Sequence, residues 1–248
     1  MKKFKNKIAV VTGGNSGIGL AAATELVNYG ATVIITGRRK DAIEKAANEI
    51  YAIPFVADQS KLDDIDKLTQ FIRDRFGKLD ILFVNAGITG TGGMIANADE
   101  SNFDNVMNIN FKGAYFTLSK LSPVLNDGAS VVILSSMVAS THVPGSSIYQ
   151  ASKAALNSFA KTAAAELASR KIRVNMISPG PTKTQVLDKM GLDAIAVQNV
   201  WDNLASEKIP LRKIGTPEDV AKLVIYLSDE HASYITGSDF VIDGGLSL

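Results

Sequence analysis

The sequence predicts an α/β fold, in which one doubly wound, mostly parallel sheet of seven strands carries helices on both faces. Short runs rich in β-branched residues recur along the chain, and segments with helical spacing of apolar residues separate them. The runs are almost continuously apolar, as expected of strands that are covered on both sides. Strands that alternate with helices indicate right-handed crossovers and therefore a parallel sheet.

The elements follow one another without a linker, a repeat or a low-complexity tract, so residues 1–248 are interpreted as a single domain. Residues 182–213 follow the sixth strand and contain no strand of their own. We expect them to cover the substrate, because ligands of open α/β sheets lie beyond the carboxyl ends of the strands. The expected strands are Lys7–Thr12, Thr32–Thr36, Ile53–Val56, Ile81–Val84, Val131–Leu134, Ile172–Ile177 and Phe240–Ile242, and the clearest helices are Ala21–Tyr29, Asp41–Ile50, Leu62–Phe76 and Ala151–Ser169.

Composition excludes several classes of function. The net charge of +1, with both signs interspersed, gives no indication of a nucleic-acid or membrane partner. The chain has no cysteine, and neither His142 nor His231 stands in a metal-ligand spacing, so no metal site is expected. The apolar run behind the basic start is too short for a signal core, and no stretch approaches the length of a membrane span. We therefore expect a soluble, cytoplasmic protein.

A glycine-rich turn after the first strand predicts a dinucleotide cradle. Thr12 ends the strand, and Gly13, Asn15, Ser16, Gly17, Ile18 and Gly19 lead into the first helix. Backbone amides at a helix start can bind a pyrophosphate, helped by the positive end of the helix dipole. Glycine is needed where a Cβ would collide with the ligand or with a neighbouring strand. The alternative is a tight strand-to-helix turn that binds nothing.

The end of the second strand bears on the choice of nicotinamide cofactor. An acid there binds a ribose 2′-hydroxyl, whereas a basic group accommodates a 2′-phosphate. Arg38 and Arg39 follow Gly37, and no acid appears before Asp41, so NADP(H) is favoured and NAD(H) is the alternative. Solvated arginines at a helix start would give the same pattern. Asp58, beyond the third strand, is expected either to accept a bond from the adenine amine or to cap the next helix.

An acid/base group is predicted around the fifth strand. Tyr149 and Lys153 share one helical face, and Ser136 stands at the carboxyl end of the strand before them. A free tyrosine titrates near pH ~10, and a neighbouring ammonium together with the positive charge of an oxidised nicotinamide would lower that pKa. A tyrosine tuned in this way can donate a proton to a carbonyl oxygen or accept one from an alcohol. Ser136 could bond the developing alkoxide. A surface tyrosine and lysine on a helix are the alternative interpretation.

Together these residues resemble the short-chain dehydrogenase/reductase family, in its compact type of about 250 residues with a Rossmann-type fold. The likeness covers essentially the whole chain, with small departures at Phe83-Val84 and at Gln59. It rests on the segment from Thr12 to Gly19, Asn85-Ala86-Gly87, Asn110, Ser136, Tyr149 with Lys153, Ser178-Pro179-Gly180 with Thr184, and Asp243-Gly244-Gly245.

The resemblance implies a role for each matching residue. Tyr149 would be the catalytic acid/base, Ser136 would orient the substrate, and Lys153 would lower the tyrosine pKa and bind the nicotinamide ribose. Asn110 would hold a water in a proton relay. The Asn85-Ala86-Gly87 segment would line the adenosine side, and Pro179, Gly180 and Thr184 would lie by the nicotinamide. The resemblance also implies a homotetramer, in which the helix after Asn110 and the helix of the catalytic tyrosine meet a second subunit.

Three functions are compatible with the sequence. The first is an NADP(H)-dependent enzyme that interconverts a small-molecule carbonyl and an alcohol. The second is a 3-oxoacyl-(acyl-carrier-protein) reductase, which is disfavoured because residues 122–130 carry no Lys or Arg for an acidic carrier. The third is a non-catalytic NADP(H)-sensing protein. Enoyl reduction is less favoured, because related enoyl reductases space their tyrosine and lysine more widely. The expected substrate-lining residues are Thr89, Gly90, Ala139, Val143, Pro144 and parts of 185–205.

Overall fold

The computed structural model describes residues 3–184 and 194–248, and within them it forms one seven-stranded sheet in the order β3-β2-β1-β4-β5-β6-β7. Every neighbouring pair of strands is parallel, so the predicted fold class is confirmed. The strands are β1 (Ile8–Thr12), β2 (Thr32–Gly37), β3 (Ile53–Val56), β4 (Leu79–Val84), β5 (Leu125–Leu134), β6 (Arg173–Pro179) and β7 (Asp239–Ile242).

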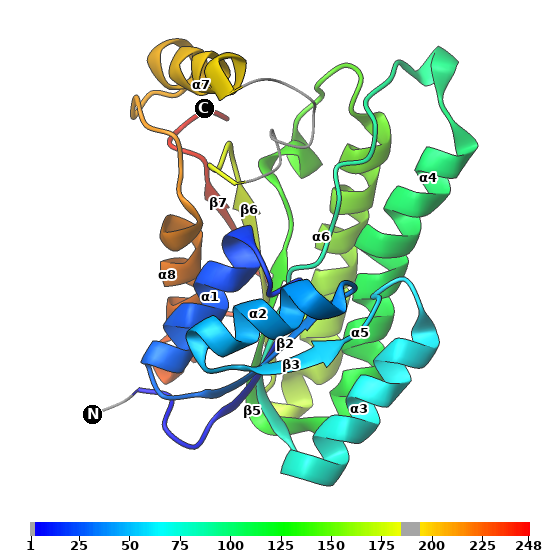
Figure 1. The fold of residues 1–248 in the computed structure, drawn as a ribbon, viewed down its shortest axis with the longest axis vertical. Coiled ribbons are helices and arrows are strands. Elements are labelled where there is room, and N and C mark those ends of the chain that lie inside the picture. Colours follow the sequence, from blue (N-terminus) through cyan, green and yellow to red (C-terminus); the bar gives the residue numbers. More distant parts are fainter. Residues whose placement is uncertain (1–2, 185–193) are drawn as a thin grey trace.

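Helices cover both faces of the sheet (Figure 1). Alternate residues of one strand face opposite layers: Val10 packs with α3, α5 and α6, whereas Ala9 and Val11 pack with α1, α2 and α8. Both faces of the central strands are thereby buried, which explains their continuous apolarity. The shorter helices are α1 (Gly17–Asn28), α2 (Lys40–Ile50), α3 (Leu62–Phe76), α4 (Glu100–Met107), α5 (Ala114–Leu121), α7 (Ala194–Asn203) and α8 (Pro217–Ser228), and the longest is α6 (Ser147–Leu167).

Several boundaries differ from those expected. Helix α6 begins at Ser147, so Tyr149 and Lys153 lie within it, whereas helix α1 begins at Gly17, as the glycine-rich turn predicts. Strand β5 begins at Leu125, because Leu125 pairs with Leu79 ahead of a register shift. Residues 122–130 therefore lie at the amino ends of the strands, at the end of the sheet remote from Tyr149. Their lack of Lys and Arg therefore says nothing about a carrier at the active-site mouth, and that expectation from the sequence was wrong.

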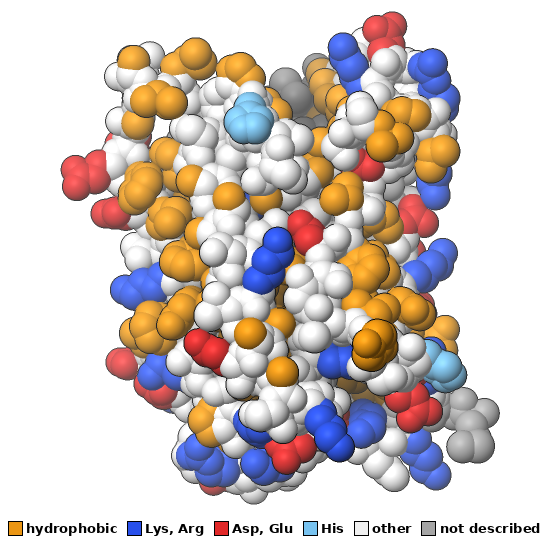
Figure 2. All heavy atoms as spheres, turned by 180° about the vertical axis from the view of Figure 1, so that it is seen from behind, with side chains coloured by type: hydrophobic (Ala, Val, Ile, Leu, Met, Phe, Trp, Pro, Cys, Tyr) orange, Lys and Arg blue, Asp and Glu red, His pale blue; other side chains and the backbone are white. Residues whose placement is uncertain are grey.

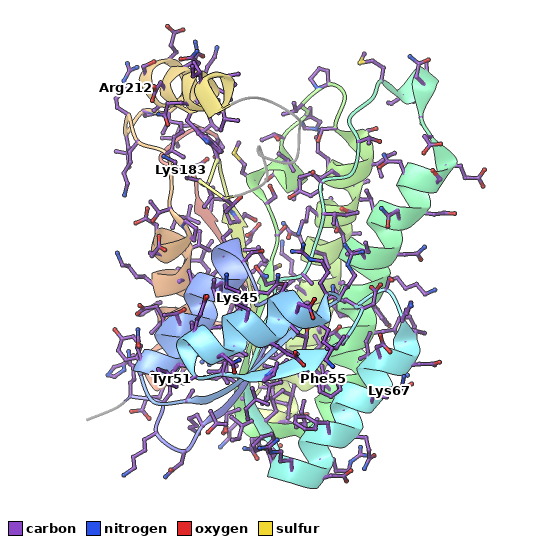
Figure 3. The ribbon with its side chains drawn as sticks, in the orientation of Figure 1. Lys45, Tyr51, Phe55, Lys67, Lys183 and Arg212 are labelled. Carbon is purple, nitrogen blue, oxygen red and sulfur yellow. The ribbon has the colours of Figure 1, made fainter. Side chains whose placement is uncertain are left out.

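The segment expected to cover the substrate, 182–213, is described only in part, because residues 185–193 lie outside the described residues. Its described part contains α7 and ends near a short parallel bridge between Thr182 and Gly215. In Figure 3, Lys183 and Arg212 mark the two ends of this part of the chain, on the side of α7. Among the described residues, no helix has the length and apolarity needed to cross a membrane.

The strand order reverses between β1 and β4, which are neighbours in the sheet although β2 and β3 separate them in sequence. At such a switch point the connections leave in opposite directions and open a crevice at the carboxyl ends of the strands. The glycine-rich turn follows β1 and the Asn85-Ala86-Gly87 segment follows β4, so both border this crevice.

Candidate active site

Hydrogen bonds fasten the glycine-rich turn to the segment after β4. The hydroxyl oxygen of Thr12 accepts bonds from the backbone N–H groups of Asn85 and Ala86, both at 3.0 Å. In return, the Asn85 side-chain amide donates to the carbonyls of Thr12 (2.8 Å) and Gly13 (3.1 Å). Thr12 itself is almost fully buried. Two loops that are far apart in sequence thus form one rigid floor at the switch point.

Glycine is required at two positions of the turn for different reasons. Gly13 has φ +64°, a left-handed conformation that other residues adopt only with strain. At Gly19 a Cβ would lie 2.2 Å from the Gly13 carbonyl oxygen, so no side chain fits. Ser16 precedes α1 without capping it through its side chain, and the first turn of α1 carries no acidic residue. This helix start fits an anionic pyrophosphate, because its amides and dipole face no competing carboxylate.

The residues after β2 leave a basic and open edge beside the turn. Arg38 and Arg39 are exposed, and within 3–184 and 194–248 neither guanidinium has a hydrogen-bond or ion-pair partner. A Cβ at Gly37 would lie 3.0 Å from the Asn15 side-chain oxygen, which places Asn15 at the end of β2. A 2′-phosphate and the arginines of this edge are compatible in charge, although solvated arginines would look the same.

Asp58 lies next along this edge and does not cap α3 with its side chain. The residue before α3 is Lys61, without a side-chain cap, and the Asp58 carboxylate instead accepts bonds from the backbone and hydroxyl of Ser60. The backbone N–H of Asp58 is bound by Asp64. The helix-capping alternative for Asp58 is therefore wrong, and the carboxylate holds a local turn at the sheet edge.

The acid/base pair lies on α6, with the lysine far more buried than the tyrosine. Lys153 is 3% exposed, and its ammonium donates a 2.8 Å bond to the carbonyl of Leu134 at the end of β5. Its Nζ lies 5.8 Å from the centre of the Tyr149 ring. Burial lowers the pKa of Lys153 to about 8. Lys153 is thus close to changing its protonation state near neutral pH.

Burial also governs Tyr149, and in the opposite sense to that expected from its neighbour. Burial raises the pKa of the Tyr149 hydroxyl, and a hydrogen bond with Ser136 lowers it by less. Lys153 was predicted to lower the Tyr149 pKa, but it is not among the groups of the protein that shift this pKa. At neutral pH the tyrosine is therefore protonated, which is the form that can donate a proton. Ser136 lies at the start of a short turn after β5 and is mostly buried.

Asn110 lies in a π-helical turn, Asn108–Gly113, between α4 and α5. Such wide turns are often found at functional sites. The buried Asn110 amide forms two 2.8 Å bonds with Ile88, accepting from its N–H and donating to its carbonyl, and a third of 3.1 Å with the Ser152 hydroxyl. A Cβ at Gly87 would lie 3.2 Å from the Asn110 oxygen and 3.6 Å from Lys153 Nζ. The two side chains thus converge on one glycine.

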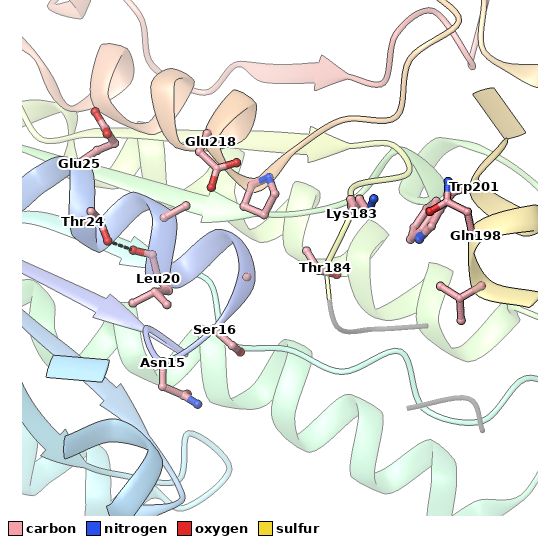
Figure 4. A pocket seen from close by; sticks show the side chains of 14 residues that line it. Asn15, Ser16, Leu20, Thr24, Glu25, Lys183, Thr184, Gln198, Trp201 and Glu218 are labelled. Carbon is pink, nitrogen blue, oxygen red and sulfur yellow. Dashed lines mark hydrogen bonds between the residues drawn. The ribbon is translucent and has the colours of Figure 1, made fainter. Parts of the chain in front are cut away.

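The segment after β6 closes the crevice on its far side. Gly180 donates to the Ile242 carbonyl (2.9 Å), and the place of its Cβ is taken by Asp243, which fixes Pro179 and Gly180 beside β7. A Cβ at Gly17 would lie 3.3 Å from the Thr184 methyl, so Thr184 contacts the glycine-rich turn. A cavity of about 550 Å³ lies between this turn, Lys183, and Gln198 and Trp201 of α7. Figure 4 shows the side chains that line it.

The structure brings together most of the residues predicted from the sequence, and it adds others. Arg38, Arg39 and Asp58 lie apart from the acid/base group, along the β2–β3 edge. Sequence reasoning gave no role to Gln59, Ile88 and Ser152, which hold Asn110 and its surroundings. Only the sequence position of Gln59, noted as a departure from the family pattern, could have drawn attention to it. Among the described residues, no group of three His, Cys, Asp or Glu side chains is arranged to hold a metal ion.

Comparison with known proteins establishes the class of this chain. Residues 13–247 match a family model described as "Enoyl-(Acyl carrier protein) reductase". The chain is 33% identical to the 3-oxoacyl-[acyl-carrier-protein] reductase FabG of Thermotoga maritima, with 99% of this chain and 100% of the relative covered. It is 34% identical to the human dehydrogenase/reductase SDR family member 4, over 97% of this chain and 87% of the relative.

Solved structures agree with these relatives. A short-chain dehydrogenase/reductase of unknown function from Caenorhabditis elegans, determined with cofactor, has a TM-score of 0.92 and 31% identity, covering 99% of this chain and 96% of its own. Levodione reductase also has a TM-score of 0.92, at 27% identity and with 98% of each chain covered. The chain belongs to the short-chain dehydrogenase/reductase family, whose members are oxidoreductases that use NAD(P)(H). The glycine-rich turn, the acid-free helix start and the buried lysine fit such a cofactor.

Proposed function

We propose that the protein is an NADP(H)-dependent oxidoreductase that interconverts a carbonyl compound and a secondary alcohol, with Tyr149 as the acid/base. The observation that carries this proposal is the convergence of two buried side chains, Asn110 and Lys153, on Gly87 beside Tyr149. A protein that only senses a dinucleotide has no need of a buried ammonium next to a tyrosine hydroxyl. The bound nicotinamide would supply or accept the hydride.

The residues of the chain divide the remaining work. In reduction, the Tyr149 hydroxyl donates its proton to the substrate oxygen, and in oxidation its phenolate accepts one. Ser136 donates a hydrogen bond to the same oxygen as negative charge develops there. Lys153 lies next to the ring with a pKa of about 8, below that of the tyrosine, so its ammonium can return a proton to the phenolate that reduction leaves behind. Asn110 holds the water through which that proton returns to solvent.

The cofactor is held by four groups of residues in this proposal. Gly13, Asn15 and the start of α1, from Ser16 to Gly19, bind the pyrophosphate. The adenosine side is lined by Asn85, Ala86, Gly87 and Asp58. The 2′-phosphate is bound by Arg38 and Arg39, which are exposed and have no partner among the described residues. The nicotinamide is flanked by Pro179, Gly180 and Thr184. NAD(H) is the alternative cofactor, and it would leave both arginines in solvent.

The proposed substrate is small and uncharged. The two segments that leave the carboxyl ends of β4 and β5, residues 88–98 and 137–148, contain no Lys, Arg, Asp or Glu. Met94, Ile95 and Val143 of these segments are exposed. Figure 2 shows hydrophobic side chains gathered at the upper left, whereas charged side chains stand at the upper right and crowd the lower end. An apolar mouth attracts an apolar ketone or alcohol rather than an ion.

A 3-oxoacyl-(acyl-carrier-protein) reductase is the second candidate, because the Thermotoga maritima relative carries that name over its full length. An acidic carrier needs a basic surface near the mouth. The two mouth segments provide none, which favours the small-molecule function. Tyr149 and Lys153 stand four residues apart, which disfavours enoyl reduction despite the description of the family model.

The test begins with parallel titrations of the protein with NADPH and NADH, followed by cofactor fluorescence. NADPH should bind more tightly, and Arg38→Asp should remove that preference. Exposed Lys45→Met on α2 is the control and should leave both affinities unchanged. Tighter binding of NADH by the wild type would reject the cofactor assignment.

A screen of neutral ketones against keto acids and an acyl-carrier thioester then tests the reaction. We expect turnover of neutral ketones, lost by about 10²-fold or more in Tyr149→Phe while cofactor affinity persists. Preference for the thioester would favour the second candidate. Tight cofactor binding without turnover of any substrate would favour a sensor.

We also propose that the protein assembles as a homotetramer through the α5–α6 face. Tyr115 and Phe159 stack there with ring centres 4.6 Å apart, and Phe111 completes the cluster. Tyr115 is 41% exposed, so the cluster leaves aromatic surface uncovered in a single chain. Light scattering should give a mass near four times the chain mass, and Phe159→Glu should reduce it. A monomeric wild type would reject the assembly.

A further inference from the structure

The side-chain amide of Gln59 links the two segments that surround the acid/base group. Gln59 follows β3, far in sequence from both segments, and is 8% exposed. Its Nε2 donates one bond of 3.2 Å to the carbonyl of Ala86 and another of 3.0 Å to the carbonyl of Ile109. Ala86 belongs to the segment after β4, and Ile109 belongs to the π-helical turn. One buried side chain thus holds two loops together.

The orientation of this amide is fixed by its partners. Both neighbours of Nε2 are backbone carbonyls, so a flipped amide would place its oxygen against two other oxygens. The Gln59 Oε1 atom is buried and has no hydrogen-bond partner among the described residues. An unpaired buried acceptor is destabilising. The contribution of the amide therefore lies in its two donated bonds. An apolar side chain of the same length would remove these bonds together with the unpaired oxygen.

The linked segments are the ones that position Asn110. Asn110 itself bonds to Ile88, two residues after Ala86, from the side of the π-helical turn. Gln59 and Asn110 therefore tie the same two segments together at neighbouring residues. The turn also packs directly on Gln59, because a Cβ at Gly113 would lie 2.5 Å from the Gln59 carbonyl oxygen. A shift of the turn would move Asn110 relative to Lys153.

We propose that Gln59 is a positioning residue for proton transfer: it holds the π-helical turn against the segment after β4 and so fixes Asn110 next to Lys153. Gln59 touches neither the tyrosine hydroxyl nor the ammonium, so it acts only through Asn110. This inference rests on the proposed function. A small displacement of an acid/base group lowers the rate by much more than it lowers stability, because proton transfer requires near-contact geometry.

The test compares the wild type with Gln59→Met, which keeps the length of the side chain and removes both donors and the unpaired oxygen. Thr69→Val on α3 is the matched control, because Thr69 is equally buried and bonds only within its own helix, to the Ile65 carbonyl. Five quantities are measured in each protein: kcat and KM on a neutral ketone, the thermal midpoint, cofactor affinity, and the ionisation of Tyr149. The last is obtained as the difference in phenolate absorbance between each protein and its Tyr149→Phe counterpart.

Gln59→Met should lower kcat by about tenfold and leave KM and cofactor affinity within about twofold. The Tyr149 ionisation should move by about half a pH unit or more, because burial is what raises the tyrosine pKa and a displaced turn changes how solvent reaches the site. The thermal midpoint should change little. Thr69→Val should change none of these quantities except the midpoint. Unchanged kcat and unchanged Tyr149 ionisation in folded Gln59→Met would overturn the proposal.

If Gln59→Met fails to fold, Gln59→Glu takes its place. A protonated carboxyl keeps one donor toward the two carbonyls, whereas a carboxylate has none and is repelled by both. Turnover relative to wild type should therefore fall as pH rises through the ionisation of that carboxyl, and a constant ratio would reject the proposal. If the wild type turns over no carbonyl or alcohol, the proposed function fails, while the Tyr149 ionisation still decides the role of Gln59.

Discussion

Replacing the buried Lys153 with methionine should remove activity and, near neutral pH, make the protein more stable. Burial lowers the pKa of Lys153 from 10.5 to about 8, a difference of about 2.5 pH units. At 1.36 kcal/mol per unit, the folded state carries the charged lysine at a cost of about 3 kcal/mol below pH 8. Lys153→Met removes that cost but leaves the Leu134 carbonyl without its partner, which is destabilising by about 1–3 kcal/mol.

The sign of this effect with pH follows from proton binding. Between about pH 8 and pH 10.5 the unfolded chain binds more protons at Lys153 than the folded chain, so wild-type stability rises with pH in that window. The cost is present in full below about pH 8 and is absent above pH 10.5. The stabilisation by Lys153→Met should therefore shrink by about 2 kcal/mol between pH 7 and pH 9.5. The lost bond to Leu134 cancels from this difference, because it is the same at both pH values.

Urea unfolding at both pH values and at equal protein concentration measures the difference. Lys45→Met on the surface of α2 is the control (Figure 3). Its 3.9 Å pair with Glu49 is exposed, so its effect should stay below about 0.5 kcal/mol at either pH. An equal free-energy change for Lys153→Met at both pH values would refute the reasoning, because it would mean that Lys153 keeps its ordinary pKa in the folded protein.

Three further predictions follow from other parts of the site. Gly19→Ala should abolish cofactor binding and lower the thermal midpoint by several degrees, because its Cβ would lie 2.2 Å from a carbonyl oxygen, whereas Gly93→Ala, with 3.9 Å of clearance, should be neutral in both assays. Thr216→Ala removes the capping box of α8 and should cost about 1 kcal/mol in urea unfolding without changing kcat, and a loss of turnover would contradict its purely structural role. The rate of reduction should be flat below about pH 8 and fall above it, because protonated Tyr149 is the donor and Lys153 loses its charge there. The rate of oxidation should rise over the same pH range. Parallel pH profiles in both directions would contradict this assignment.

The elements that could be predicted from sequence are those whose pattern is local. The central strands are buried on both faces, so their apolar runs identify them, and α3 was predicted at its observed bounds because its apolar spacing is regular. Strand β5 was placed too short, because Asn126, Asp127 and Gly128 look like a turn. They lie in the register shift between the Leu79–Leu125 and Ile81–Ser130 pairs, and the strand runs on through them. Helices α4, α7 and α8 were not predicted as elements. Their ends depend on neighbours that a linear pattern does not contain.

The candidate site shows the same division. The spacing of Tyr149 and Lys153 predicts a shared helix face, and the structure places both on α6. Three features depend on burial or on distant partners and could not be predicted: the direction of the Tyr149 pKa, the two bonds of Gln59, and the π-helical turn around Asn110. The carrier argument failed for a related reason, because it required knowing to which end of the sheet residues 122–130 belong.

Burial acts on the acid/base pair as a whole. It raises the pKa of Tyr149 and lowers that of Lys153, so each group moves toward its neutral form, and the charged pair is disfavoured by both shifts. A site with this balance is sensitive to any positive charge that arrives nearby, because one such charge stabilises the phenolate and promotes loss of the lysine proton. The bond to Leu134 and the amides of Asn110 and Gln59 keep the groups in register while their protonation changes. In the proposed mechanism, the fold's contribution to proton transfer is then the rigidity of these bonds rather than a preset tyrosine pKa.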